Sequence, residues 1–404
     1  MRVALISEHA SPLAAIAGVD AGGQNVHVAE LAAALHRQGH AVTVYTRRDA
    51  PDLPETVRTA RGFTVVHVPA GPARHIPKDE LLPYMRPFGQ WLAARWAAGG
   101  APDIVHAHFW MSGVAAEVAT SEIPAPVVQT FHALGSVKRR YQTTADTSPP
   151  ARVDIERHLA LTVARVIAQC TDEVDELAAL GVPRSKIRVV ASGVDAQRFT
   201  PVGPAAPRTP GRHRILSVGR LVPRKGFDEL VHVLPDLPDA EVVIAGGPAG
   251  DLDTDPEARR LRSLAEELGV GDRLRLLGAV PPEQMPQWYR SADVVACTPW
   301  YEPFGLTPLE AMACGVPVVA RAVGGLRDSV VDGSTGFLVP PGDRRGLVEA
   351  LAALLADEGR RREFGAAARL RAVSRYGWSR QAAAVASVYA DLHTPREVLV
   401  EAPT

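Results

Sequence analysis

The chain has 404 residues, of which 44 are Lys or Arg and 45 are Asp or Glu, so its formal net charge is −1. A chain without a basic excess lacks the overall field that attracts nucleic acid, and its apolar runs are too short to cross a membrane. The length and the 46% hydrophobic content predict two domains of about 200 residues, each with an ordinary core.

Cysteine usage indicates a cytoplasmic protein. Cys170, Cys297 and Cys314 are scattered, odd in number and set in apolar surroundings, which is typical of reduced, buried thiols. The apolar run at residues 1–7 is too short for a secretory signal and predicts a first strand instead.

The first half of the chain alternates between strand and helix patterns, which predicts parallel βαβ units with helices on both faces of the sheet. A loop at residues 8–23 joins the first strand to the first helix, and such a long connection is more often functional than structural. We expect strands at 2–7, 41–46, 63–68, 104–106, 127–130, 166–168 and 187–190, and helices at 25–38, 79–98, 152–165 and 171–180.

A change of composition separates the two halves. Residues 200–212 hold four prolines and few apolar residues, which predicts an interdomain linker. The alternation then restarts and ends in a helical tail at 344–393. We expect strands at 214–218, 241–245, 274–276, 294–297, 318–320 and 336–339, and helices at 227–234, 257–268, 283–290, 306–313 and 326–331.

Two carboxylates, Glu302 and Glu310, flank the start of the helix that follows the strand at 294–297. Open α/β sheets bind ligands at this edge, and acids there suit the hydroxyl groups of a sugar. Alternatively, Thr307 and Glu310 form a capping box, and Glu302 is a solvated loop acid. If the helix begins at Thr307, the Glu310 side chain folds back on the helix start and is unavailable to a ligand. If it begins near Phe304, Glu310 points into the cleft, and we predict this second arrangement.

Glycines and cations mark two further loops. Gly22 and Gly23 precede the first helix, where the backbone can approach a ligand closely. Arg220 and Lys225 follow the strand at 214–218, and cations at a helix start oppose the helix dipole unless an anion is present. A diphosphate would satisfy both cations; solvated surface charge is the alternative, and we assign Arg224 to the surface.

Potential metal ligands do not form a convincing site in the sequence. Asp251 and Asp253 form a D-x-D triplet, but Asp255 followed by proline is a typical helix N-cap, so we predict capping rather than metal binding. His106 and His108 share a face of one strand, yet no third ligand is evident. His132 lies at the carboxyl end of another strand and is the better functional candidate.

Taken together, these motifs resemble the family 4 retaining glycosyltransferases of the GT-B fold, over nearly the whole chain from Val3 to about Leu392. Residues 302–310 match the E-x7-E motif of that family, and Arg220 and Lys225 match its diphosphate-binding pair. The resemblance implies an α/β protein of two doubly wound, Rossmann-like domains facing each other across a cleft. Residues 1–199 would bind the acceptor, residues 200–375 would bind the donor, and a helix at about 376–393 would pack back on the first domain.

The resemblance also implies a nucleotide-sugar donor, with a UDP-sugar favoured and a GDP-sugar as the alternative. Glu310 would hold the ribose and Glu302 the transferred sugar. Transfer would be a same-face substitution that needs no metal or other cofactor, with the leaving diphosphate helping to deprotonate the acceptor. Expected catalytic residues are His132, Glu302, Arg220 and Lys225. Expected donor contacts are Gly22, Gly23, Arg220, Lys225, Val280, Glu302, Phe304, Gly305, Leu306, Thr307 and Glu310.

Within the family, the acceptor half is most similar to the actinobacterial inositol-3-phosphate N-acetylglucosaminyltransferases of mycothiol synthesis, with sucrose-phosphate synthases as a neighbouring group. Trp110 and Ala133 replace a tyrosine and a threonine of those enzymes, and Ala15-Ile16 replaces Gln-Pro. We therefore expect a polar small-molecule acceptor, phosphorylated or cyclitol-like. Expected acceptor contacts are His9, Asp20, Asn25, Lys78, Trp110, His132 and Arg152.

Two other functions are left open by the sequence. One is a sugar-nucleotide-binding protein without transferase activity. The other is a lipid-directed glycosyltransferase that touches a membrane peripherally through the basic runs at 138–140 and 360–362. A homodimer is also left open.

Overall fold

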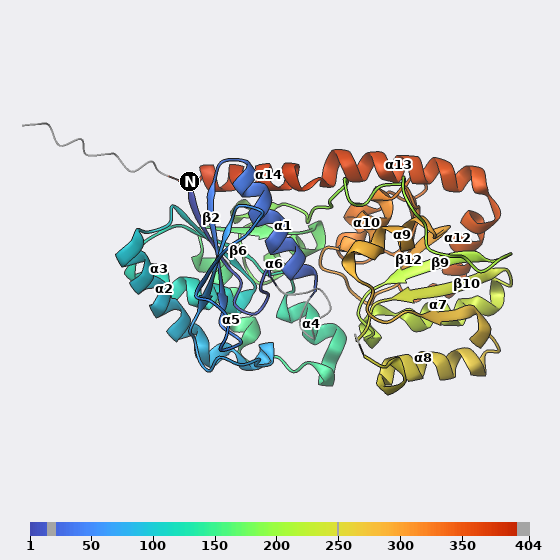
Figure 1. The fold of residues 1–404 in the computed structure, drawn as a ribbon, viewed down its shortest axis with the longest axis horizontal. Helices are drawn as coiled ribbons and strands as arrows, with labels where there is room; N and C mark the ends of the chain where they lie inside the picture. The colour runs from blue at the N-terminus through green and yellow to red at the C-terminus, as the bar shows by residue number, and fades with distance from the viewer. Residues whose placement is uncertain (14–21, 249, 394–404) are drawn as a thin grey trace, which may run out of the picture.

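Two largely parallel sheets, one in each half of the chain, organise the protein in the computed structural model, which describes residues 1–13, 22–248 and 250–393 (Figure 1). Helices cover both faces of each sheet, so the predicted fold class is confirmed. Among the described residues, no helix is both long and apolar enough to cross a bilayer.

The first sheet has the order β3-β4-β2-β1-β5-β6-β7-β8, and the short β3 is its antiparallel member. Its strands are β1 (Arg2–Ile6), β2 (Ala41–Arg47), β3 (Thr56–Arg58), β4 (Thr64–Val68), β5 (Ile104–His108), β6 (Val127–Thr130), β7 (Arg165–Ala168) and β8 (Ile187–Val189). The helices of this half are α1 (Gly23–Arg37), α2 (Met85–Gly99), α3 (Trp110–Glu122), α4 (Gly135–Gln142), α5 (Arg152–Thr162) and α6 (Thr171–Ala179).

The second sheet is parallel throughout, in the order β11-β10-β9-β12-β13-β14. Its strands are β9 (His213–Val218), β10 (Ala240–Ala245), β11 (Leu274–Leu276), β12 (Val294–Cys297), β13 (Val318–Arg321) and β14 (Gly336–Val339). The later helices are α7 (Phe227–Val233), α8 (Pro256–Glu267), α9 (Met285–Arg290), α10 (Leu306–Ala313), α11 (Gly325–Ser329), α12 (Arg344–Ala356), α13 (Glu358–Tyr376) and α14 (Trp378–Ala390).

Several predicted elements differ from the observed ones. The helix expected at 79–98 begins only at Met85, after two 3₁₀ turns, because Pro83 has no N–H to continue a helix from upstream. The sequence did not predict α3 or α4. The polar segment of α4 lacks an apolar stripe, and the Ser112-Gly113 pair obscures the start of α3.

The helical tail is confirmed, and its last helix returns to the first domain. In Figure 1, α14 lies beside α1, and Trp378 and Tyr389 belong to the same buried core as Val28 and Leu31. The segment between β8 and β9 is tied to the second domain, because Arg290 donates to the carbonyl oxygens of Thr200 and Pro204. The two domains are therefore linked both by this segment and by the junction of α13 with α14.

Candidate active site

The loop after β12 is held tightly against the start of α11. The N–H of Gly325 donates to the carbonyl oxygen of Glu302 at 3.0 Å. Gly324 has φ +48°, and a Cβ there would lie 2.1 Å from the same oxygen, so only glycine fits. This packing places the side chain of Glu302 at the carboxyl edge of the second sheet, as its position in the sequence predicted.

Lys225 and Glu302 form an ion pair in a pocket beside the start of α10. Lys225 Nζ donates to Glu302 Oε2 at 2.5 Å, and the two side chains are only 17% and 13% exposed. Burial alone would raise the pKa of Glu302, but Lys225 and Arg224 outweigh burial and hold the pKa below its usual value. Gly305 and Thr307 also line this pocket, so a cation and the amino end of a helix converge on it.

Glu310 does not take part in a capping box. The helix begins at Leu306, and the Thr307 hydroxyl donates to the carbonyl oxygen of Val218 at 3.3 Å. Tyr289, which is fully buried, donates its hydroxyl to Glu310 Oε2 at 2.6 Å. Burial raises the pKa of Glu310 to about 7, although the Tyr289 hydrogen bond acts in the opposite direction. The capping alternative is therefore wrong, and binding of the ribose by Glu310 stays a prediction.

The remaining donor residues lie at the same edge of the second sheet. Arg220 lies two residues after the end of β9 and is exposed. Val280 is half-buried in the loop after β11. This loop is fixed to the end of β10 because the Gly246 N–H donates to the carbonyl oxygen of Gly278 at 2.8 Å. The assignment of Arg224 to the surface is wrong. Its guanidinium packs 5.4 Å from the Tyr301 ring centre instead of extending into solvent.

Across the cleft, the start of α1 faces the start of α10. A Cβ on Gly23 would lie 2.8 Å from the Phe304 ring and 3.6 Å from Leu306, so the two domains approach each other here as closely as glycine allows. A Cβ on Gly22 would meet nothing within 4 Å. Asn25 accepts from the Gly22 N–H at 3.0 Å and donates to the carbonyl oxygen of Ser11 at 2.9 Å, and its contact with the acceptor stays a prediction.

His132 belongs to a buried group of imidazoles. It has φ +62°, a strained conformation for a residue other than glycine, and its Nε2 lies 2.9 Å from Nδ1 of His108. His27 of α1 also packs against it, with 5.0 Å between the ring centres. Burial lowers the pKa values of all three, that of His27 to about 3, so they are neutral at pH 7. No third ligand for His106 and His108 was evident in the sequence, because His27 and His132, whose rings lie beside His108, are distant from it along the chain.

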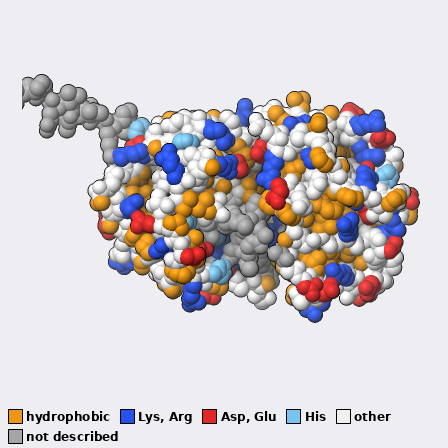
Figure 2. Space-filling model, viewed as in Figure 1, with side chains coloured by type: hydrophobic (Ala, Val, Ile, Leu, Met, Phe, Trp, Pro, Cys, Tyr) orange, Lys and Arg blue, Asp and Glu red, His pale blue; other side chains and the backbone are white. Residues whose placement is uncertain are grey.

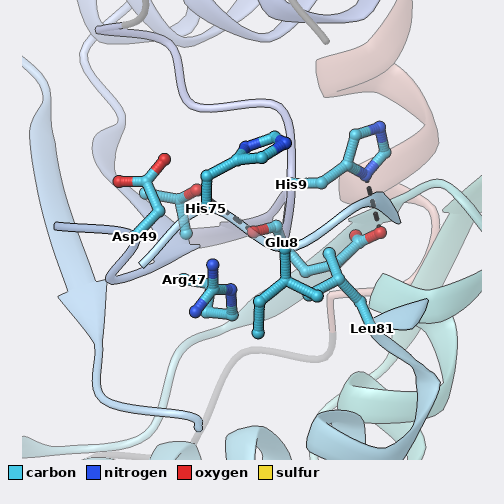
Figure 3. Close-up of a pocket in the computed structure, with 8 residues that line it drawn as sticks. Glu8, His9, Arg47, Asp49, His75 and Leu81 are labelled. Atoms are coloured by element: carbon cyan, nitrogen blue, oxygen red, sulfur yellow. Dashed lines mark hydrogen bonds and ion pairs between the residues drawn. The ribbon is translucent and has the colours of Figure 1, made fainter. Parts of the chain in front are cut away.

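A polar pocket opens at the carboxyl ends of β1 and β2 (Figure 3). His9 Nδ1 lies 2.7 Å from Glu8 Oε1, and the Glu8 carboxylate is buried. Thr46, Arg47, Asp49 and His75 complete its polar lining. Sequence reasoning found His9 but not Glu8 or Arg47, because single charged residues at or near the ends of strands carry no distinctive spacing.

Arg152 and Trp110 lie deeper than expected for acceptor contacts. Arg152 donates to Glu156 at 2.7 Å, to Ser148 at 3.0 Å and to the carbonyl oxygen of Ala133 at 2.6 Å. Trp110 is fully buried, 6.0 Å from that guanidinium. Arg152 thus ties the Ala133 and Ser148 segments together and packs over the rings of Phe109 and Trp110. Lys78 is half-buried in a 3₁₀ turn, and Asp20 lies outside the described residues.

The aspartates after β10 are caps, as predicted. Asp255 accepts from the Ala258 N–H at the start of α8, and Asp251 accepts from the Asp253 N–H. Asp253 itself pairs with Arg262. The three carboxylates thus have structural partners.

Comparison with protein families identifies both halves of the chain. A model described as "Glycosyltransferase Family 4" matches residues 21–198, and one described as "Glycosyl transferases group 1" matches residues 205–371. The D-inositol 3-phosphate glycosyltransferase of Xylanimonas cellulosilytica is 40% identical over 96% of each chain. The enzyme of the same name from Streptomyces bingchenggensis is 37% identical over 96% of this chain and 89% of its own.

Solved structures show the same fold. Sucrose-phosphate synthase from Thermosynechococcus elongatus superimposes with a TM-score of 0.87 at 30% identity, covering 97% of this chain and 98% of its own. Anabaena HepE, solved in complex with UDP-glucose, superimposes with a TM-score of 0.72 over 97% of this chain and 100% of its own. At 20% identity, this second likeness concerns the fold alone.

Proposed function

The chain belongs to glycosyltransferase family 4, and we propose that it transfers a sugar, with retention, from a UDP-sugar to a small polar acceptor that is phosphorylated or cyclitol-like. Both halves match the family, and relatives named D-inositol 3-phosphate glycosyltransferase align over nearly their whole length. The names of these relatives support the acceptor class, and the UDP-glucose complex of a protein with the same fold supports the donor class.

The observation that carries the proposal is the Lys225–Glu302 pair beside the start of α10, with Gly23 opposite. A diphosphate placed there would draw Lys225 away from Glu302, which would free the carboxylate to accept from sugar hydroxyls. The positive end of α10 and Lys225 would then stabilise the charge that develops on the leaving diphosphate. Close approach of Gly23 and Phe304 would exclude water, whose attack on the donor is the competing reaction.

The Glu8–His9 pocket is the proposed acceptor site. Its buried carboxylate can accept from hydroxyl groups, and the imidazoles of His9 and His75 line the pocket beside it. Arg47 already donates to the carbonyl oxygens of Arg48, Pro72 and Arg74. Arg152 is already engaged by Glu156, Ser148 and Ala133, so it would reach a phosphate only by exchanging one of these partners. This arrangement favours an acceptor defined mainly by its hydroxyl groups.

A donor screen tests the proposal. Purified protein is incubated with UDP-glucose, UDP-N-acetylglucosamine, GDP-mannose or GDP-glucose, with and without cyclitol phosphates, free cyclitols and hexose phosphates. We expect nucleotide release that depends on both a UDP-sugar and one acceptor, and a product with the anomeric configuration of the donor. Calorimetric binding of UDP-sugars without turnover on any acceptor would support the non-catalytic alternative instead.

The surface gives little support to the lipid-directed alternative. Lys138 pairs with Asp79 and Asp146, Arg140 pairs with Glu176, and Arg362 pairs with Glu358. Figure 2 shows basic and acidic side chains interspersed over the visible face of both domains. We propose that the enzyme works in the cytoplasm, where its three buried free thiols stay reduced.

A further inference from the structure

Four histidines meet at the carboxyl ends of β5 and β6, but their hydrogen bonding is unequal. His106 has both ring nitrogens paired: Nδ1 lies 2.6 Å from the Tyr389 hydroxyl, and Nε2 lies 2.8 Å from the Thr130 hydroxyl. His108 and His132 share one contact with each other. Their other nitrogens, Nε2 of His108 and Nδ1 of His132, are buried and have no hydrogen-bond partner among the described residues. Because a neutral imidazole has one N–H and one lone pair, this contact leaves one buried lone pair and one buried N–H without a partner. Such groups need an explanation, and one is an ion that replaces the His108–His132 contact, so that each ring offers it a lone pair.

His27 completes a group of three. One ring nitrogen from each of His27, His108 and His132 lies within 4.8 Å of the other two. Nδ1 of His27 lies 3.0 Å from the Ser192 hydroxyl, which can accept its proton and leave the Nε2 lone pair for an ion. The Gln169 amide lies on the same side, with its Nε2 3.3 Å from that Nδ1. Turning the amide over would bring its partnerless Oε1 to Nδ1, where it also accepts that proton. Metal-binding histidines usually have an outer partner of this kind, which fixes the tautomer and the ring orientation.

The ligand set selects the kind of ion. Three imidazoles without a carboxylate or thiolate suit zinc, cobalt, nickel or copper, and not magnesium or calcium, which prefer oxygen ligands. The three rings come from a helix, a strand end and a strained turn residue, so their positions are set by rigid elements.

We propose that His27, His108 and His132 form a binding site for a divalent transition-metal ion of the zinc type, and that the ion inhibits the enzyme. The fourth coordination position would go to water or to a group entering the cleft. Phe304 of the second domain packs against both His27 and His132, with ring centres 6.3 and 6.2 Å apart. An ion here would hold His132, which we expect beside the transferred sugar. Binding of the ion does not depend on the proposed function, whereas inhibition by the ion rests on it.

The test measures binding before activity. Full-length protein, dialysed against a chelator, is titrated with Zn²⁺ in competition with a chromophoric chelator, and separately with Co²⁺ while the visible absorption of tetrahedral cobalt is recorded. The variants are His27→Gln, which keeps a polar group near Ser192, and His27→Phe, which keeps the shape of the ring. His158→Gln is the matched control, because the His158 side chain is 56% exposed. Circular dichroism melting identifies the His27 variants that are folded.

We expect the wild type and His158→Gln to bind one equivalent of Zn²⁺ and to develop the cobalt absorption. A folded His27 variant should bind Zn²⁺ about 100-fold more weakly or worse, because loss of a ligand exceeds the effect of losing an outer-shell partner. Zn²⁺ should inhibit transfer by the wild type and not by that variant. Equal Zn²⁺ affinity of the wild type and a folded His27 variant, or no stoichiometric binding by the wild type, would overturn the site. Stoichiometric binding by a protein that transfers no sugar would instead contradict the proposed function alone.

Discussion

At the scale of single residues, the candidate site depends on pairs whose members would be costly to bury alone. Glu302 stays ionised because Lys225 and Arg224 compensate for its burial, and Glu310 is held by one hydrogen bond from Tyr289. Removal of one member of a buried ion pair leaves an uncompensated charge, so such pairs respond strongly to single substitutions. The same coupling lets a diphosphate that competes for Lys225 change the state of Glu302.

Lys225→Ala should lower kcat/KM by roughly 10²-fold or more, the effect of losing one group that stabilises developing negative charge. The expected reason is loss of the cation facing the diphosphate, together with a rise in the pKa of Glu302. Arg345→Ala is the control, since that side chain is 89% exposed and far from the pocket lining. Steady-state kinetics with a saturating acceptor measure the effect, and unchanged kcat/KM would remove Lys225 from the donor site.

Glu310 should make stability depend on pH. Because its pKa in the folded protein is about 7, above the ordinary value of 4.5, the folded state holds a proton that the unfolded state loses between these values. Its contribution is therefore present below pH 4.5 and is lost as the pH rises to about 7, by up to about 3 kcal/mol. Glu310→Gln keeps an acceptor for Tyr289 but does not titrate.

Melting temperatures of the wild type and Glu310→Gln, measured from pH 5 to pH 8, test this expectation. The variant should gain several degrees on the wild type between pH 5 and pH 7, and the difference should level off above pH 7. Comparison with the wild type cancels the titration of Glu173, whose pKa burial also raises to about 7. A difference that stays constant over this range would show that Glu310 is ionised throughout.

At the scale of elements, the amino ends of α1 and α10 face each other across the cleft. Helix N-termini carry unpaired N–H groups and a partial positive charge. Gly23 opens α1 and packs against Phe304 and Leu306 at the start of α10, so both ends can reach one anion only while the contact remains this close. The absence of a side chain at residue 23 thus sets the separation between the two helices.

Gly23→Ala should raise the KM for the donor at least several-fold, because its Cβ would lie 2.8 Å from the Phe304 ring and must displace it. Gly22→Ala provides the comparison. Its Cβ would meet no atom within 4 Å, so its effect should be clearly milder. Nucleotide affinity by calorimetry and steady-state KM measure both variants. If both variants raised the KM equally, the loop would require the backbone freedom of glycine rather than the close approach of residue 23 to Phe304.

At the scale of the whole molecule, α6 and α11 are joined across the domain interface by an exchange of hydrogen bonds, in which a carboxylate of each helix accepts from the start of the other. Asp172 accepts from the Gly324 N–H at 2.8 Å and from Arg327 at 3.2 Å. In return, Asp328 accepts from the N–H and the hydroxyl of Thr171 at 2.7 and 2.6 Å. Each domain thus supplies an acid to the start of a helix in the other. Because Gly324 also supports Glu302, this exchange couples the relative position of the domains to the donor site.

Asp172→Ala should shift the protein toward a more open arrangement. Two partly exposed hydrogen bonds contribute about 1 kcal/mol or slightly more, so the ratio of closed to open molecules should fall roughly fivefold to tenfold. Small-angle scattering should show a larger radius of gyration, and kcat/KM should fall by a similar factor. Asp175→Ala is a matched control on the same helix, because Asp175 pairs with Arg184 within its own domain. If the two variants behaved identically, the hydrogen bonds of Asp172 across the interface would have no role in domain closure.

Local pattern determined the broad architecture. Alternation of apolar strands with helical segments predicted two parallel sheets, the Asp255-Pro256 pair predicted a cap, and Glu302 was placed at a strand's carboxyl edge. These features depend on residues that are neighbours in sequence, and backbone geometry converts such neighbours directly into periodicity, caps and turns. The family motif added the expected roles of Arg220, Lys225 and Glu310, which stay predictions.

Only the tertiary structure brought together the partners that decide the chemistry. His106 meets Tyr389, 283 residues away, because α14 returns to the first domain. His27 joins His108 and His132 because β1 pairs with β5, and β5 with β6. Glu310 turns to Tyr289 rather than to Thr307 because the helix begins one residue earlier and Thr307 bonds to β9. Strand order and domain packing place side chains across long separations, and no local periodicity records which distant groups will meet.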